Sequence, residues 1–301
     1  MDPRPIGVFD SGLGGLSIVK QVKRLLPGEQ IVYFGDTARV PYGNRSRQTL
    51  LHYARQDSRF LLSHGVKMLV AACGTISTAV DEGFTRALPV PYMGVVEVTA
   101  RAAAEATHSG QVGVIGTAAT VRSGAFERAV TGHRPGVRVH SRPCPLFVPL
   151  VENGYVEPGN PVTTLVAKDY LSFVPEEGID TLILGCTHFP LLKSIIGPVV
   201  GDGVKLIDPG VCVARRLRSF LEEKGMESGP SAPAEDCYYV SDLCAKTLSE
   251  RGRTAAPFFD GRISPLEDRR PGPRRLAERR LGQLHSPEKG GSTLVFWQVM
   301  E

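Results

Sequence analysis

The sequence predicts an α/β protein made of two similar, doubly wound parallel-sheet domains that face each other across a cleft. Short apolar segments of strand length alternate with amphipathic helical segments, which is typical of a parallel sheet covered on both faces. Each half of the chain contains an apolar run that ends in a cysteine, Cys73 in the first half and Cys186 in the second. The 301 residues are also enough to bury two cores of ordinary size.

The first half is expected to contain four strands, at residues 6–9, 31–34, 68–72 and near 91–94. Helices are expected at 17–26, at 46–63, directly after Cys73, and near 99–108. The apolar spacing of Ile18, Val22 and Leu25 predicts the first helix, and the Pro27-Gly28 pair ends it. Asp10 and Asp36 directly follow the first two strands, at the edge where parallel sheets bind ligands.

The second half repeats this order. Strands are expected at 111–115, near 137–140, at 182–184 and at 205–207, with helices through Phe126 and at about 161–173, and a polar-ended turn at 149–154. A further helix to residue 224 and a strand at 237–240 should return to the first domain. The predicted domains are therefore 1–97 with 210–301, and 98–209. A short helix is expected to end at Arg279-Arg280, and residues 294–297 to form a strand whose partner stays open.

Composition is typical of a soluble globular protein, with 42% hydrophobic and 22% charged residues. We expect a cytoplasmic protein without a membrane segment, because no apolar run is long enough to span a bilayer and the amino terminus lacks the apolar core of a signal peptide. The net charge of +4 comes from an arginine-rich tail at 261–289. Such a tail keeps nucleic-acid binding open as an alternative, although a charge run is more often a solvated face.

The other cysteines are interpreted as structural free thiols. The chain has six cysteines but no CxxC pair, which argues against a metal site. The four residues interpreted in this way are Cys144, Cys212, Cys237 and Cys244.

Cys73 and Cys186 have positions suited to chemistry. A thiol between the end of a strand and the start of a helix meets backbone dipoles that lower its pKa. Two such thiols facing one small cleft could invert a carbon stereocentre without a cofactor, one removing a proton and the other delivering one. His188 can assist Cys186, while Asp10 lies on the side of Cys73. Hydroxyl groups that could hold an amino acid follow the same strand ends: Ser11, Thr75, Thr117, Thr120 and Thr187.

A dinucleotide-binding enzyme is the main rival among enzyme classes. The glycine-rich turn after the first strand and Asp36 after the second favour it. However, the turn lacks the third glycine of the fingerprint, and Asp10 would repel a pyrophosphate.

An ordered set of motifs resembles the glutamate racemases of the cofactor-independent aspartate/glutamate racemase superfamily. The matching stretches cover most of residues 6–240 and lie at 7–15, 33–37, 41–43, 72–73, 116–121, 149–154 and 184–190. The resemblance implies that Cys73 and Cys186 are the two bases, with no cofactor, and that the product is D-glutamate for peptidoglycan. Another acidic amino acid, such as aspartate, is the nearest alternative substrate. A homodimer is left open.

The resemblance also assigns roles to further residues of this sequence. Supporting catalytic roles fall on Asp10, Asp36, Glu152 and His188. Substrate contacts fall on Asp10, Ser11, Tyr42, Gly43, Gly74, Thr75, Thr117, Thr120, Thr187 and His188. Gly74 stands where the family usually has asparagine, so the sequence predicts weaker substrate binding, with space left for water or a neighbouring group, and a lower KM in a Gly74→Asn variant.

Overall fold

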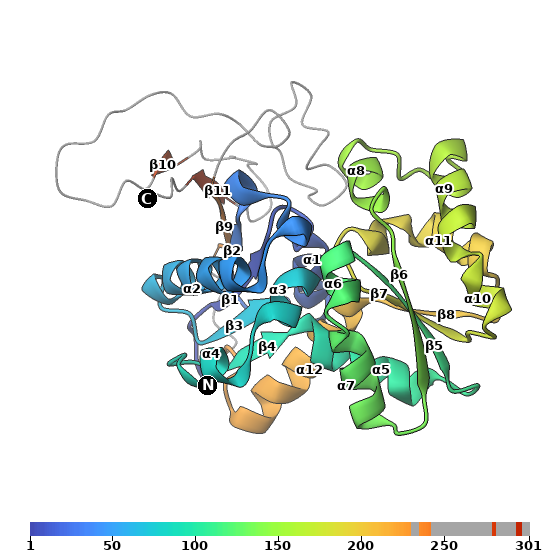
Figure 1. The fold of residues 1–301 in the computed structure, drawn as a ribbon. Coiled ribbons are helices and arrows are strands. Elements are labelled where there is room, and N and C mark those ends of the chain that lie inside the picture. The colour runs from blue at the N-terminus through green and yellow to red at the C-terminus, as the bar shows by residue number, and fades with distance from the viewer. Residues whose placement is uncertain (230–234, 242–278, 281–292, 297–301) are drawn as a thin grey trace.

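The structure is a computed structural model that describes residues 1–229, 235–241, 279–280 and 293–296 (Figure 1). Its first sheet has the strand order β10-β11-β9-β2-β1-β3-β4, and every neighbouring pair is parallel except β10 and β11. The strands of this sheet are β1 (Ile6–Asp10), β2 (Ile31–Gly35), β3 (Met68–Ala71), β4 (Tyr92–Gly94), β9 (Cys237–Val240), β10 (Arg279–Arg280) and β11 (Thr293–Phe296).

The second sheet is entirely parallel and has the order β6-β5-β7-β8. Its strands are β5 (Gln111–Gly116), β6 (Arg138–Pro143), β7 (Thr181–Leu184) and β8 (Lys205–Ile207). The same order, second-first-third-fourth in chain sequence, occurs in the first sheet as β2-β1-β3-β4. The predicted fold class is therefore confirmed, including the internal repeat. The exact domain boundaries stay a prediction.

Helices connect the strands and lie on both sides of the first sheet (Figure 1). Apolar side chains alternate between the two faces: Val8 and Val70 pack toward α1, while Phe9 and Phe34 belong to the core under α2. The α-helices are α1 (Leu16–Leu25), α2 (Arg47–Ser63), α3 (Gly74–Ala79), α4 (Glu82–Arg86), α5 (Val95–Ala106), α6 (Ala118–Arg122), α7 (Ala125–His133), α8 (Phe147–Glu152), α9 (Pro161–Leu171), α10 (Phe173–Glu176), α11 (Lys193–Val200) and α12 (Pro209–Lys224). Three 3₁₀ turns are η1 (Thr37–Arg39), η2 (Tyr42–Asn44) and η3 (Phe189–Leu192).

Several local predictions were wrong. The helix through Phe126 is two helices, because Gly124 adopts a left-handed φ of +62° between them. The helix expected at about 161–173 is confirmed as α9, and α10 follows it as a separate helix. The turn expected at 149–154 is largely the end of α8, whose Pro149 lies within the first turn, where a helix tolerates proline. Arg279-Arg280 form β10 rather than a helix end, because they pair with β11.

The returning chain joins the first sheet through β9, which pairs in parallel with β2. The strand expected at 294–297 is β11 at Thr293–Phe296, and its partners are β9 and β10. Among the residues that the structure describes, none of the helices combines the length and apolarity needed to cross a membrane.

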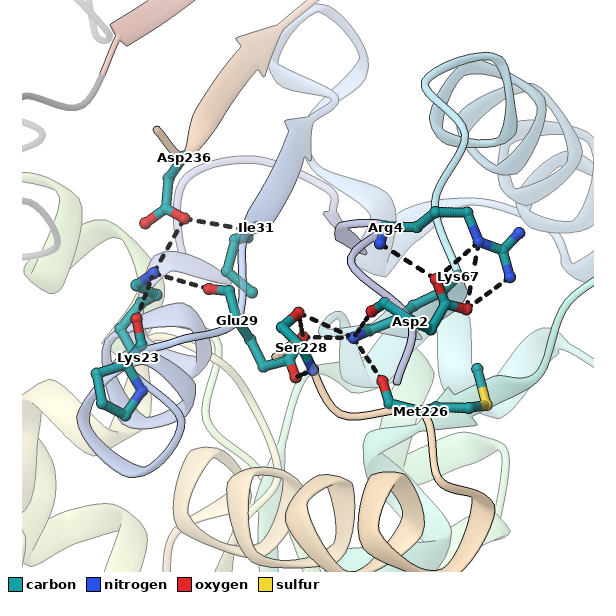
Figure 2. Close-up of polar contacts among 10 residues, drawn as sticks. Asp2, Arg4, Lys23, Glu29, Ile31, Lys67, Met226, Ser228 and Asp236 are labelled. Atoms are coloured by element: carbon teal, nitrogen blue, oxygen red, sulfur yellow. Dashed lines mark hydrogen bonds and ion pairs between the residues drawn. The ribbon is translucent and has the colours of Figure 1, made fainter. Parts of the chain in front are cut away.

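A buried polar cluster ties the amino-terminal segment to the chain that leaves α12 (Figure 2). We call Asp2, Glu29, Lys67, Met226 and Ser228 the Lys67 cluster. The fully buried Lys67 ammonium lies 2.6 Å from a Glu29 carboxylate oxygen and donates to the carbonyls of Asp2 at 2.9 Å and Met226 at 2.7 Å. Glu29 also accepts hydrogen bonds from the backbone N–H of Ser228 at 2.8 Å and from its hydroxyl at 3.0 Å.

Candidate active site

A cavity of about 400 Å³ lies beyond the carboxyl ends of strands from both sheets. This is the position where parallel α/β sheets bind ligands. Cys73 follows β3 and Cys186 follows β7, so the two thiols reach the cavity from different sheets. The other predicted site residues that line it are Ser11, Tyr42, Gly43, Gly74, Thr75, Thr117, Glu152, Thr187 and His188.

The Cys73 thiol is 5% exposed and donates a long hydrogen bond to the Ser11 hydroxyl, with 3.7 Å between Sγ and Oγ. Burial raises the pKa of Cys73 to about 12, and the nearby Asp10 adds to the shift. Cys73 is therefore a protonated thiol, ready to donate a proton rather than to accept one.

The Cys186 thiol has a titratable partner. Its Sγ lies 3.7 Å from Nδ1 of His188, and Nε2 of the same ring lies 3.5 Å from Glu152 Oε1. Burial alone would lower the pKa of His188, but the hydrogen bonds with Cys186 and Glu152 outweigh it and raise the pKa to about 10.

Asp10 lies behind the cavity wall rather than on it. It is fully buried, and its Oδ2 accepts hydrogen bonds from the backbone N–H groups of Gly12 at 3.2 Å and Gly15 at 3.0 Å. Burial raises the pKa of Asp10, an effect that His188 partly opposes. Oδ1 has no hydrogen-bond partner within the described part of the chain. Asp10 therefore lies behind the cavity, hydrogen-bonded to the turn that follows β1.

A chain of threonine hydroxyls crosses from one sheet to the other. Oγ1 of Thr75 lies 3.2 Å from Oγ1 of Thr117, which lies 3.0 Å from Oγ1 of Thr120. Thr120 is 2% exposed and does not line the cavity, so its place is behind Thr117. A second link comes from Ser17 in α1, whose hydroxyl donates to the Thr187 carbonyl at 2.8 Å.

Asp36 is fully buried and does not line the cavity either. It accepts a hydrogen bond from the hydroxyl of Tyr42, which does line the cavity. Asp36 therefore supports the wall loop at 37–44 from behind.

The space predicted beside Gly74 is occupied. A Cβ atom at Gly74 would lie 2.7 Å from the carbonyl oxygen of Gly185, a separation that real Cβ atoms essentially never show. Gly74 follows Cys73 and Gly185 precedes Cys186, so this backbone contact sets how closely the two cysteine turns approach. This neighbouring backbone argues against the gain in affinity predicted for an asparagine at this position.

Sequence reasoning missed other residues of the site. Cys144, interpreted as structural, lines the cavity, and burial raises the pKa of its thiol to about 12. Arg39, Asp57 and Ser241 lie behind Tyr42 and are described below. No local pattern marks them. Cys73, Cys144, Cys186, Cys212 and Cys237 are all free thiols, and Cys244 lies outside the described residues.

Paired thiols from two parallel sheets, together with a buried histidine and carboxylates, define an α/β enzyme that exchanges protons with a small polar molecule. The chain belongs to the Asp/Glu/Hydantoin racemase family, whose model matches residues 14–217. It is 46% identical over 263 residues to a glutamate racemase of Geobacter metallireducens, covering 87% of this chain and 95% of that protein.

Solved structures agree with this family. A glutamate racemase of Francisella tularensis in complex with D-glutamate has a TM-score of 0.77 at 39% identity, covering 86% of this chain and 94% of the other. A glutamate racemase of Thermus thermophilus in complex with beta-chloro-D-alanine has a TM-score of 0.74 at 43% identity, with the same coverage.

Proposed function

We propose that this protein is a glutamate racemase that interconverts L- and D-glutamate by two-base proton transfer between Cys73 and Cys186. The observation that carries the proposal is that two cysteine thiols, each following the third strand of its own sheet, line one cavity. Relatives that match most of the chain are named glutamate racemase.

The proton balance is simple. A thiolate removes the Cα proton of the bound amino acid and becomes a thiol, and the electron pair of the C–H bond passes into the adjacent carboxylate group. The opposite thiol then delivers its proton to the other face of Cα and becomes a thiolate. The overall step changes only the configuration of Cα, and the reverse reaction exchanges the roles of the two cysteines.

The two thiols start from different protonation states in this proposal. The proposal assigns the role of starting base to Cys186, which lies beside His188, and Glu152 holds the other side of that ring. Cys73 is the protonated acid, held in that state by burial and by Asp10. One enantiomer therefore meets the starting state directly, and the other requires a proton to be redistributed first.

Hydroxyl and backbone groups of the cavity would hold the charged ends of glutamate. The proposed contacts come from Ser11, Tyr42, Gly43, Gly74, Thr75, Thr117, Thr187 and His188, all of which line the cavity. Asp10, Asp36 and Thr120 would act from behind it. The proposal needs no cofactor.

We also infer a cellular role. D-glutamate produced in the cytoplasm would supply peptidoglycan synthesis.

We propose that the two halves of the enzyme are residues 1–97 with 210–301, and residues 98–209. We also propose that the enzyme assembles as a homodimer.

A chiral assay of the purified chain, without added pyridoxal phosphate, tests the function. L-glutamate should yield D-glutamate, and L-aspartate should react much more slowly. Faster turnover of L-aspartate than of L-glutamate would show that aspartate is the substrate. Absence of racemisation of both amino acids would contradict the proposal.

A further inference from the structure

We propose that Arg39, Asp57 and Ser241 are positioning residues that hold the cavity wall at residues 37–44 in the shape that binds substrate. They act through Asp36 and the Tyr42 hydroxyl. This inference rests on the proposed function, because the wall belongs to the glutamate-binding cavity. Five residues of this wall besides Tyr42 line the cavity: Thr37, Val40, Pro41, Gly43 and Asn44.

Arg39 bridges two buried carboxylates. Its Nε donates to Asp36 and its terminal nitrogen donates to Asp57 at 3.0 Å. Asp36 and Asp57 are 0% and 1% exposed, so neither carboxyl group has water to solvate a charge. A second contact fixes the guanidinium, which lies 4.1 Å from the centre of the Tyr53 ring. Arg39 is therefore held in place as the counter-charge of this pair.

The Tyr42 hydroxyl lies between the two carboxyl groups. It donates its single proton to Asp36. Oδ2 of Asp57 lies 3.4 Å from the same hydroxyl oxygen. Burial and the neighbouring Asp36 place the pKa of Asp57 well above its usual range, and the charge of Arg39 opposes this shift. Tyr42 and Arg39 thus both contact Asp36 and Asp57.

Ser241 joins this network from the far end of the chain. It directly follows β9, and its hydroxyl donates to Asp36 Oδ1 at 2.8 Å while accepting from the backbone N–H of Ala38 at 2.9 Å. The Ser241 side chain therefore ties both Asp36 and the wall to the returning strand. Removing the hydroxyl leaves a buried carboxylate oxygen and a backbone N–H without these partners.

The expected result is a defect in binding rather than in chemistry. Ser241→Ala should raise KM about five- to tenfold for both L- and D-glutamate, because the wall loses a charge-assisted hydrogen bond. Its kcat should change less than about twofold, since the hydroxyl touches neither thiol. Ser241→Thr, which keeps the hydroxyl, should restore KM toward the wild-type value. Ser172→Ala is the matched control, because its exposed hydroxyl bonds only the local Asp169 carbonyl.

Tyr42→Phe extends the test, alone and in a double variant with Ser241→Ala. It removes the hydroxyl shared by Asp36 and Asp57 and keeps the ring. If Ser241 acts through Tyr42, the fold increase in KM of the double variant should be well below the product of the fold increases of the two single variants. Independent, multiplying effects would overturn the proposed coupling. An unchanged KM in Ser241→Ala, with a lower melting temperature, would overturn the positioning role and leave a structural one. An inactive wild-type protein would instead contradict the proposed function.

Discussion

Two buried polar regions of the protein, the Lys67 cluster and the active site, differ in how fully their groups are paired. In the Lys67 cluster the ammonium has oxygen partners at 2.6–2.9 Å, and Glu29 accepts two further hydrogen bonds from Ser228. In the active site the thiol contacts of Cys73 and Cys186 are 3.7 Å long. There Oδ1 of Asp10 has no partner within the described residues.

The difference separates stability from chemistry. A fully paired buried ion pair holds segments together and has little free capacity to exchange protons. A site whose groups are buried but incompletely paired has shifted pKa values and room for a substrate to complete the hydrogen bonds. Variants of the active site should therefore lower the rate of racemisation, whereas variants of the Lys67 cluster should lower the free energy of unfolding.

The largest effect is expected at the two cysteines. Cys73→Ala and Cys186→Ala should each lower kcat for racemisation by a factor of about 10² to 10⁴, because each removes an obligatory acid or base. The free energy of unfolding should stay close to the wild-type value, since neither thiol makes a short hydrogen bond. Chiral chromatography and urea unfolding of each variant measure the two quantities. An active variant would remove that cysteine from the mechanism.

The opposite pattern is expected at Lys67. Lys67→Met should lower the free energy of unfolding by about 3–5 kcal/mol, because it leaves the buried Glu29 carboxylate without its counter-charge. Racemisation per folded molecule should be unchanged. Arg86→Met is the control, since the exposed Arg86–Glu82 pair should contribute at most about 1 kcal/mol. A comparable loss in both variants, measured by urea unfolding, would remove the distinction between the regions.

Gly74 should give a smaller, catalytic effect. Gly74→Ala should lower kcat about tenfold or more, because its Cβ must push Gly185 and the Cys186 turn outward. Gly74→Asn should be impaired as well, rather than gaining affinity. Gly197→Ala, whose Cβ would meet no atom within 4 Å, is the control for steady-state kinetics. A Gly74→Ala variant within twofold of wild type would show that the cysteine turns do not need this close contact.

The smallest effect concerns the pH dependence of stability. The pKa of His188 is raised from 6.5 to about 10, so its protonated form stabilises the folded state. That contribution is complete below about pH 6.5 and is lost as the pH rises through about 10. The difference in unfolding free energy between wild type and His188→Gln should therefore shrink over this range. A difference that stays constant with pH would contradict the ion pair with Cys186 and Glu152.

Features with a local signature could be predicted from the sequence. Cys73 and Cys186 each end a short apolar run, which is why β3, β7 and the internal repeat were predictable. Positions of site residues next to strand ends, such as Ser11 and Thr117, follow from the same pattern. The tail at 261–289 lies almost wholly outside the described residues.

Features that depend on distant contacts could not be predicted. Asp57 is one of many polar residues in the long helix α2, and only the fold brings it to the Tyr42 hydroxyl. Ser241 approaches Ala38 because β9 pairs with β2. Gly74 suggested a missing side chain, whereas the structure reveals a neighbouring backbone in its place. Such contacts are properties of the packed chain rather than of any segment.

The direct test of two-base catalysis is racemisation in deuterium oxide. With L-glutamate supplied, the first D-glutamate formed should carry deuterium at Cα, while the remaining L-glutamate should stay mostly unlabelled. The reverse labelling should appear when D-glutamate is supplied, because each thiol exchanges its proton with solvent and serves one face of Cα. Early product that retains the original protium would mean that a single base returned the same proton, and would contradict separate roles for Cys73 and Cys186.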